Sequence, residues 1–458
     1  MNYDYDVLVI GAGPGGCIAA REMAAAGLRV CLCDRSTRED LGNPIVIELE
    51  KSIWDPLMGG APLDQEIPYN AKQVNIFSPR GNLGIAVKDE GLIYAVYLHK
   101  IVRRMAEQAQ AAGAQFLPQH SATQALVEDG YVVGARFRVG RGSAKIRARL
   151  TVDASGYDAA LVRKLDPQLG IELPEHRLDN VAAENHICNI DREAAQEAVN
   201  KGLAGDEQVW TKLAFAGNYS TEFAFLSLRQ ELGYILVGLN AAYDQPTPAE
   251  LIKAYAARVG FLGKRLIGGK GLIRVRRAIP RLVTDGLAVI GEAACQVIPT
   301  LGSGAAGSML AAKYLSQAAV AALNYGRPST AALWPYAWRY MSGRGSVLAS
   351  YDITRLLLER FSTEQMTAFI EDGLLQPEDQ ATSVTVQPMI PSLSSMPARA
   401  RGLYKHPDLL PLFAGQGLAM RRARKLYAAY PRVWDPELFQ RWRKAERELF
   451  KPAEAFGS

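Results

Sequence analysis

The sequence has few of the residues that would hold a metal ion or build a disulfide framework. Its 458 residues include five cysteines and five histidines, and neither set is clustered with the spacing of metal ligands. Cys31 and Cys33 lie two apart on one predicted strand and therefore share a face of it. We interpret the cysteines as reduced thiols that pack in the interior, and we expect no metal site.

Long apolar runs and a strong excess of charge are also missing. No run approaches the ~18 consecutive apolar residues that a membrane-spanning helix needs. The net charge of +5 is small for this length and does not indicate dedicated nucleic-acid binding. Because the first strand is predicted to begin near residue 6, we expect no signal peptide. We therefore expect a cytoplasmic protein whose membrane contact, if any, is peripheral.

What the sequence does have is a glycine-rich turn between a strand and a helix. The apolar strand 6–10 leads into Gly11-Ala-Gly13-Pro14-Gly15-Gly16 and a helix of small residues, and the next strand, 30–33, ends on Asp34. This is a βαβ unit with G-x-G-x-x-G spacing. Gly11 permits the tight turn, Gly13 lets the backbone approach a pyrophosphate, and Gly16 lets helix and strand pack closely. We predict dinucleotide binding, with Asp34 accepting a hydrogen bond from a ribose hydroxyl.

Two later segments repeat parts of this arrangement. The apolar strand 150–153 ends on Asp153 and is followed by Gly156, and the strand 287–290 stops on Gly291 and Glu292. The second of them continues through a glycine-rich loop into an apolar helix at 308–323, whose first turn can face an anion. Ordinary turns and glycine packing are the alternatives, but the acid and the helix start occur together in the last segment.

In this order, the segments resemble those of the flavoprotein superfamily of geranylgeranyl reductases, aromatic-ring hydroxylases and FixC-type dehydrogenases, and most closely its geranylgeranyl reductase branch. The resemblance extends over roughly residues 1–330. It implies that the cofactor is FAD, with the third motif near its ribityl and pyrophosphate groups. Apart from Gly302-Ser-Gly304-Ala-Ala-Gly307, which belongs to the third motif, no second G-x-G-x-x-G is present that could hold NAD(P)H permanently, so NAD(P)H would act only as a transient reductant. The predicted cofactor-binding residues are Gly11, Gly13, Pro14, Gly15, Gly16, Asp34, Arg35, Ala122, Asp153, Gly156, Gly291, Glu292, Pro299, Gly302 and Gly304.

The chain departs from this family at two informative positions. Glu292 stands where the third motif normally carries Asp, and Ile45-Val-Ile-Glu48 occupies the region of the Cys-Gly-Asp segment of the reductases. The family's cysteine is therefore missing. We predict that Glu48 lies near the flavin and orients or protonates the substrate, with an ordinary surface carboxylate as the alternative. The spacing identifies no other catalytic side chain.

The overall pattern predicts an α/β protein. A Rossmann-like FAD-binding domain is expected from residues 1–172 and 272–330, with an antiparallel β-sheet domain inserted at 173–271 that covers the flavin. Residues 331–458 are expected to form a helical C-terminal region. Within these parts we predict a helix at 92–112, a hairpin at 122–139, strands at 181–187, 223–228 and 233–239, and a polar loop at 376–396.

Two groups of side chains suggest partners. Aromatic residues of the inserted domain form either the wall of an apolar pocket or the core of its sheet; they are Trp210, Phe215, Phe223, Phe225 and Tyr234. Basic helices are predicted at 419–428 and from about 437 onwards, as a solvated face or as a contact for an anionic surface such as lipid headgroups or an acidic protein.

Three functions fit these features. The favoured one is an FAD-dependent oxidoreductase that reduces or dehydrogenates an apolar isoprenoid or polycyclic molecule. The second is a flavin-dependent monooxygenase, and the third is an FAD-containing isomerase or cyclase without net redox turnover, or an FAD-binding partner protein. The expected partners are a hydrophobic small molecule and a redox partner protein, and no nucleic acid.

Overall fold

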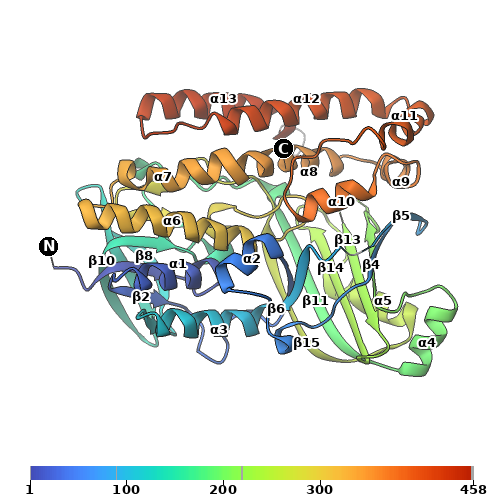
Figure 1. Cartoon of the computed structure of the whole chain (residues 1–458), viewed down its shortest axis with the longest axis horizontal. Helices are drawn as coiled ribbons and strands as arrows, with labels where there is room; N and C mark the ends of the chain where they lie inside the picture. The colour runs from blue at the N-terminus through green and yellow to red at the C-terminus, as the bar shows by residue number, and fades with distance from the viewer. Residues whose placement is uncertain (1, 89, 218–219, 455–458) are drawn as a thin grey trace.

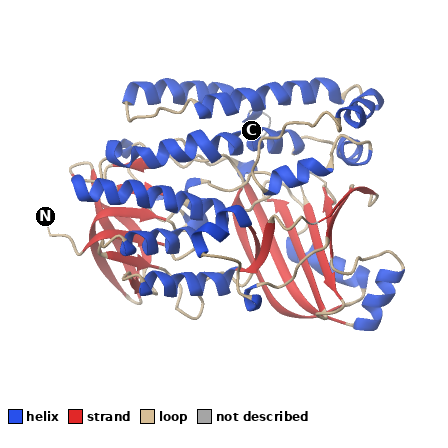
Figure 2. Ribbon diagram, in the orientation of Figure 1, coloured by secondary structure: helices blue, strands red, loops and turns tan. Residues whose placement is uncertain are grey.

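The computed structural model describes residues 2–88, 90–217 and 220–454. Two sheets lie side by side, and the helices of the C-terminal third are stacked over them (Figures 1 and 2). The sheet at the left of Figure 1 contains the N-terminal βαβ unit, and the larger sheet lies at the right.

The first sheet has the strand order β16-β17-β10-β1-β2-β7, and β1 pairs in parallel with β10 on one side and β2 on the other. The last four residues of β1, Val7 to Ile10, are buried, as expected for a parallel strand covered on both faces. The strands are β1 (Tyr5–Ile10), β2 (Val30–Cys33), β7 (Gln115–Leu117), β10 (Gly142–Asp153), β16 (Val283–Thr284) and β17 (Leu287–Val289). The helices α1 (Pro14–Ala25), α3 (Leu98–Ala111) and α6 (Ala305–Tyr325) pack beside it.

The predicted hairpin is present as β8 (Ser121–Glu128) and β9 (Tyr131–Val139). The first half of β10 pairs antiparallel with β9, and the second half of β10 pairs in parallel with β1. The long strand β10 therefore joins the hairpin to the nucleotide sheet. Sulfur atoms of Cys31 and Cys33 lie 3.6 Å apart, and all five cysteines are buried and free, which confirms the packing interpretation.

The second sheet has the order β15-β11-β14-β13-β12-β4-β5. Its antiparallel core of β11, β13 and β14 confirms the three predicted strands. The predicted range 173–271 covers only part of it, because β4 and β5 come from before residue 173 and β15 extends to Arg274. The bounds are β4 (Gln73–Phe77), β5 (Leu83–Lys88), β11 (Asn180–Ile190), β12 (Gln208–Leu213), β13 (Thr221–Ser227), β14 (Leu232–Asn240) and β15 (Leu262–Arg274).

A two-stranded ribbon, β3 (Val46–Glu50) with β6 (Ile93–Tyr97), lies between the two sheets. The predicted helix at 92–112 is therefore wrong at its start, because alternating apolar and aromatic residues at 93–97 pair with β3 before α3 begins at Leu98. Successive residues of β3 face opposite ways: Ile47 and Leu49 pack with the core of the nucleotide sheet, and Val46 packs with the large sheet.

The C-terminal region is helical, as predicted. The polar stretch 376–396 is only partly a loop, because Pro377 at the first helical turn and a capping box between Gln376 and Asp379 start helix α10. Among the described residues, no helix combines the length and apolar character needed to cross a bilayer. The helices are α7 (Thr330–Tyr340), a π-helical turn (Met341–Gly345), α8 (Ser346–Leu358), α9 (Thr363–Glu371), α10 (Pro377–Val384), α11 (Met396–Lys405), α12 (Leu409–Ala428) and α13 (Pro436–Glu454).

The remaining helices connect these layers. They are α2 (Lys51–Met58), α4 (Arg192–Asn200) and α5 (Pro248–Val259), with short 3₁₀ turns at Asp64–Glu66, Gly156–Asp158, Val162–Lys164, Pro167–Leu169, Arg177–Asp179 and Gly291–Ala294. Helix α2 packs on the main core through buried Trp54.

A buried network of ion pairs fastens the C-terminal helices to the nucleotide sheet. Arg277, just before β16, donates to Glu446 of α13 at 2.6 Å and to Asp352 of α8 at 2.9 Å. Arg355 donates to the same Asp352 and to Asp179. Burial alone raises the pKa of Asp352, but the charges of Arg355 and Arg277 outweigh it and lower the pKa to about 2.

We expect Glu446→Gln to lower the free energy of unfolding by about 3 kcal/mol or more, because it leaves the buried guanidinium of Arg277 with one charged partner fewer. Urea unfolding measures this. The matched control is Glu231→Gln, whose partner Arg192 is on the surface, with the two side chains 60% and 64% exposed; it should change the value by less than about 0.5 kcal/mol. Equal small effects of both substitutions would contradict a stabilising network.

Candidate functional site

The carboxyl ends of the parallel strands bring the three predicted motifs to one edge of the nucleotide sheet. β1 lies between β2 and β10, so the strand order reverses direction there, which is where open α/β sheets bind ligands. Backbone hydrogen bonds join the strand ends: Gly11 N donates to Cys33 O at 2.7 Å, Ala154 N to Ile10 O at 2.9 Å, and Ile290 N to Asp153 O at 3.0 Å.

The glycines of the first motif allow this packing in the way the spacing predicts. Gly11 has a φ of +100°, and a side chain there would collide with Ala154 at the end of β10. A Cβ on Gly16 would overlap the carbonyl oxygen of Gly11, and one on Gly15 would lie 2.9 Å from Cβ of Ser308 in α6. A Cβ on Gly13 would instead meet open space, so the backbone is exposed to an approaching ligand at that one residue.

Two helices present free N-terminal ends at this edge. α1 begins at Pro14 after Gly13, and α6 begins at Ala305 after Gly304; within the described chain, no side chain caps either one. Gly15 and Ser308 pack the two first turns against each other. The unpaired N–H groups and the positive ends of both helix dipoles favour an anion such as the pyrophosphate of a dinucleotide.

Asp34 lies at the end of β2, where the motif predicts it. Its Oδ2 accepts from Ala12 N in the glycine turn at 2.8 Å, and its Oδ1 accepts from Ser36 N at 2.8 Å. The carboxylate therefore also holds the glycine turn, in addition to the predicted ribose contact. His120 N donates to Asp34 O, which brings the start of β8, with half-buried Ala122, beside the end of β2.

Asp153 is fully buried, and its carboxylate is saturated by the protein. One oxygen accepts from Ser155 N and Oγ, and the other accepts from Leu161 N and Val162 N. All four acceptor positions of the carboxylate are thus occupied, so the Asp153 side chain shapes the turn after β10, and its role in cofactor binding stays a prediction. Gly156, with a φ of +70° and open space at its Cβ position, remains at the surface of that turn.

Arg35 connects the first and second motifs through an ion pair. Its guanidinium pairs with Asp158, just after Gly156, and the two side chains are largely exposed. This ion pair connects the end of β2 to the turn after β10, and its exposure means that it adds little to stability.

Glu292 is held by Arg274, a residue that the sequence reasoning missed. Oε1 of Glu292 accepts from the Arg274 backbone N–H at 2.9 Å, and the Arg274 side chain donates to the carbonyls of Glu292 and Tyr157. Burial raises the pKa of Glu292 to about 7, in spite of the opposing effects of Arg274. An arginine at the end of a strand, just before the third motif, is the signal that would have identified this bridge between the motifs.

The loop before α6 is closed on itself and connects the cofactor edge to β3. Ile298 N donates to Ser303 O at 2.8 Å, and Gly302 N donates to Ile298 O at 2.9 Å, which places buried Pro299 inside a tight turn. Gly302 has a φ of +72°, which glycine adopts readily. Ser303 Oγ donates to the backbone carbonyl of Glu48 at 3.1 Å, so the predicted catalytic residue is adjacent to the predicted cofactor loop.

Aromatic side chains of the large sheet lie on the side of Glu48. Tyr69 stacks on Phe225 with ring centroids 4.2 Å apart, and Tyr234 contacts Tyr69 and Phe223. Val46 belongs to the same cluster, and Glu48, two residues on, shares its face of β3. Burial, and secondarily the charge of Glu48, raise the pKa values of Tyr69 and Tyr234, so both phenols stay protonated at neutral pH.

The two other predicted aromatic residues are on the opposite face. Trp210 pairs with Ala224 in the sheet and contacts Phe77, and Phe215 packs with the cluster beneath α5. The period of two along a strand separates Trp210 and its partner Ala224 from Phe223 and Phe225, and Phe215 lies in the turn after β12. Three of the five residues therefore face β3, and two form the ordinary outer core.

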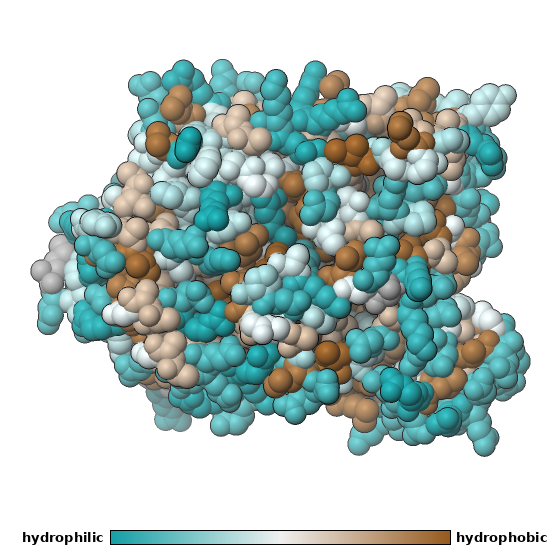
Figure 3. Space-filling model, in the orientation of Figure 1, coloured by the Kyte–Doolittle hydropathy of each residue, from teal (hydrophilic) through white to brown (hydrophobic). Residues whose placement is uncertain are grey.

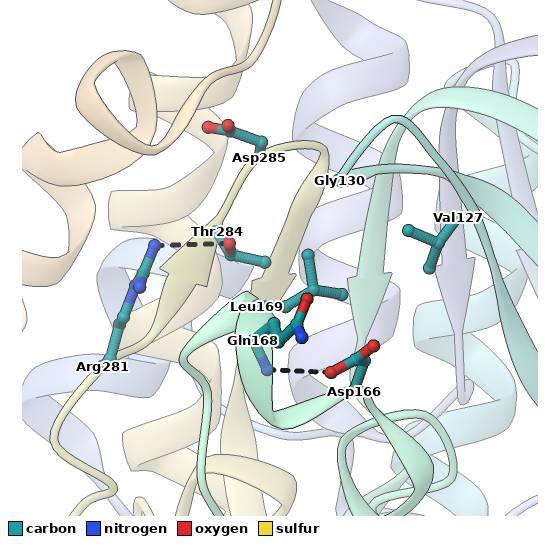
Figure 4. A pocket seen from close by; sticks show the side chains of 8 residues that line it. All are labelled: Val127, Gly130, Asp166, Gln168, Leu169, Arg281, Thr284 and Asp285. Carbon is teal, nitrogen blue, oxygen red and sulfur yellow. Dashed lines mark hydrogen bonds between the residues drawn. The ribbon is translucent and has the colours of Figure 1, made fainter.

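A separate cavity of about 360 Å³ lies at the turns before β17 and between β8 and β9, away from the carboxyl edge (Figure 4). Its polar groups bond within the protein: Arg281 donates to Thr284, and Asp166 accepts from Gln168 N. We therefore place the functional site at the carboxyl edge. The residues around the cavity are Val127, Gly130, Asp166, Gln168, Leu169, Arg281, Thr284 and Asp285.

Comparison with known proteins agrees with this geometry. Residues 6–166 match the family model described as FAD dependent oxidoreductase. The chain is 24% identical to the digeranylgeranylglycerophospholipid reductase of Sulfolobus acidocaldarius over 446 residues, which cover 96% of both chains. It is 28% identical to the protein of that name from Methanoculleus marisnigri, over 76% of this chain and 85% of the relative. The chain is an FAD-dependent oxidoreductase that is similar to geranylgeranyl reductases along most of its length.

Solved structures share the fold of this flavoprotein. A geranylgeranyl bacteriochlorophyll reductase-like protein from Thermoplasma acidophilum superposes with a TM-score of 0.71 at 19% identity, over 88% of this chain and 99% of the other. The p-nitrophenol 4-monooxygenase of Pseudomonas putida gives a TM-score of 0.59 at 13% identity, over 85% of this chain and 100% of the other. These structures confirm the predicted α/β fold, and the family match of residues 6–166 supports the predicted FAD cofactor.

We expect Gly13→Val to abolish FAD binding without unfolding the apoprotein, because the added side chain enters the open space where the backbone faces the ligand. The matched control is Gly16→Val, which should unfold the protein, because its Cβ would overlap Gly11 O. Flavin absorbance after gel filtration and circular dichroism measure the two effects. A folded Gly13→Val variant that retains stoichiometric FAD would contradict the assignment.

We expect Glu292→Gln to flatten the pH dependence of apoprotein stability. The folded pKa of about 7 is above the ordinary value of 4.5, so the carboxyl group favours folding below pH 4.5 and loses that contribution as the pH rises to about 7. Between these limits the wild type should lose on the order of 3 kcal/mol relative to the variant. Urea unfolding of the apoproteins from pH 5 to pH 8 tests this, and parallel stability curves would show that the pKa is not raised.

Proposed function

We propose that this flavoprotein saturates carbon–carbon double bonds in the isoprenoid chain of a polar lipid. The observation that carries the proposal is the full-length similarity to reductases named for digeranylgeranylglycerophospholipid, which extends through the large sheet and the helical region as well as the FAD motifs. The apolar face beside Glu48 supports an apolar substrate.

The cofactor supplies a hydride to one carbon of the double bond when it is bound and reduced. The other carbon must receive a proton, and Glu48 is the acid that this chain offers beside the aromatic cluster. For each double bond, the cofactor must receive two electrons from a reductant of the NAD(P)H class or from a reduced partner protein. For each double bond, the products are a saturated carbon pair, a deprotonated Glu48 and an oxidised electron donor. Glu48 then regains a proton from water.

The aromatic cluster provides the environment that this reaction needs. Tyr69, Phe225 and Tyr234 are each at most 4% exposed, so they form a packed apolar layer behind the face of β3 that carries Glu48. Each methylene group of an isoprenoid chain that becomes buried on this side would gain about 0.8 kcal/mol. Because both phenols stay protonated, neither adds a charge to this face. Glu48 shares a face of β3 with Val46, which packs in this cluster, so its carboxyl group is placed to deliver a proton to a chain on this side.

We expect Glu48→Gln to slow saturation of the lipid roughly 100-fold or more, because it removes the proton donor while FAD remains bound. Anaerobic holoenzyme is reduced with dithionite, mixed with a geranylgeranyl lipid, and followed by flavin reoxidation and by product mass. In D₂O, the product should gain two deuterium atoms per double bond, because dithionite supplies only electrons and both hydrogen atoms come from solvent. Glu48→Asp should restore part of the rate, and Glu39→Gln, an exposed acid on a neighbouring loop, is the matched control.

The mass of the product separates the candidate functions. A gain of two hydrogen atoms per double bond supports reduction, whereas a gain of one oxygen atom in air would show a monooxygenase and an unchanged mass would show an isomerase. Wild-type rates in the Glu48→Gln variant would exclude Glu48 as the proton donor and leave the reductase proposal to stand on the product mass.

A further inference from the structure

The positive charge of the chain is concentrated in its last helices. Residues 396–454 contain 13 Lys and Arg against 6 Asp and Glu, a net charge of +7, whereas the whole chain has a net charge of +5. The rest of the molecule is therefore slightly negative. Helices α11, α12 and α13 carry this charge, and α12 and α13 form the outermost layer in Figure 1.

Exposed apolar side chains gather at one end of the same layer. Figure 3 shows brown residues among teal ones over α11 and the start of α12. Leu393 is 92% exposed in the loop before α11, and Tyr404 is 87% exposed near its end. Met396, Leu410 and Leu418 are each about half exposed. We call these five residues the apolar end; such a set is larger than the single exposed apolar residues that are normal on a surface.

Basic residues follow the apolar end along α12. Arg421, Arg422 and Lys425 are exposed on its second half, and no carboxylate within the described chain pairs with them. Two exposed basic residues of α13, Arg441 and Lys444, continue this charge, whereas Arg447 pairs with Glu172 at 3.3 Å. A face with apolar side chains at one end and unneutralised cations along the rest has the two features that bind an interfacial element to anionic lipid.

We propose that this face docks the enzyme on an anionic phospholipid bilayer, with the apolar end inserted at the headgroup boundary and the α12 cations against the phosphates. The proposal goes beyond the reductase function and does not depend on it, because it concerns the bilayer and not the reacting chain. A merely solvated basic face would not need Leu393 and Tyr404 almost wholly exposed. An acidic partner protein is the alternative occupant of this face, and sedimentation with vesicles distinguishes it from a bilayer.

The test measures sedimentation of the FAD-loaded protein with vesicles that contain no isoprenoid lipid. The vesicles are phosphatidylcholine alone or mixed with phosphatidylglycerol, at low and at high salt. We expect binding to the mixed vesicles only, weakened by salt. Arg421→Glu/Arg422→Glu/Lys425→Glu should weaken binding at least tenfold, and Tyr404→Ser/Leu410→Ser should weaken it severalfold.

Matched controls change the same chemistry elsewhere. Arg141→Glu/Lys145→Glu reverses exposed cations at the β9–β10 turn, and Tyr325→Ser removes a 93% exposed tyrosine at the end of α6; both should bind like the wild type. An unchanged flavin spectrum shows that each variant is folded. Absence of wild-type binding to mixed vesicles, or equal losses in the controls, would overturn the proposal and favour a protein partner. Variants that bind vesicles weakly but still saturate a detergent-dispersed lipid would show that bilayer docking and the proposed reductase function are independent.

Discussion

Two helix N-termini can serve one ligand only when the helices pack closely at their first turns, and this constraint determines the whole site. α1 and α6 meet at Gly15 and Ser308, and Gly16 lets α1 descend onto the end of β1. A side chain at any of these glycines would separate the helices or lift α1 from the sheet. The edge of the sheet, the turn after β10 and the loop before α6 are all arranged around the space that this packing leaves open at Gly13.

The ribbon β3–β6 connects the cofactor edge of the nucleotide sheet to the large sheet, on the side where the substrate is proposed to bind. Because β3 packs one face against the nucleotide sheet and the other against the large sheet, the position of Glu48 is fixed by two cores at once. Ser303 then connects its backbone to the loop that precedes α6. A carboxyl group held in this way can keep one geometry through repeated turnovers, which a residue on a surface loop could not do.

The sequence predicted those parts of the fold that depend on local pattern. Gly11 to Gly16 and Asp34 follow a spacing whose physical reasons are local, and they lie where expected. The role of Asp153 was not predictable, because its four hydrogen-bond donors come from the fold of the following turn. Arg274 was missed because its partners, Glu292 and Tyr157, are brought to it by tertiary contacts. The division of the aromatic residues between two faces depended on the exact register of β12 and β13, which composition does not give.

The ion pair between Arg277 and Glu446 also has a consequence for synthesis of the chain. The two residues are 169 positions apart, so at ~5–20 residues per second the arginine is made about 10–30 s before its partner. Until then Arg277 has Asp352 as its carboxylate partner and lacks Glu446. A chain that ends before α13 would leave this buried guanidinium with one charged partner fewer, which weakens the packing of the C-terminal helices on the segment that leads into the third motif.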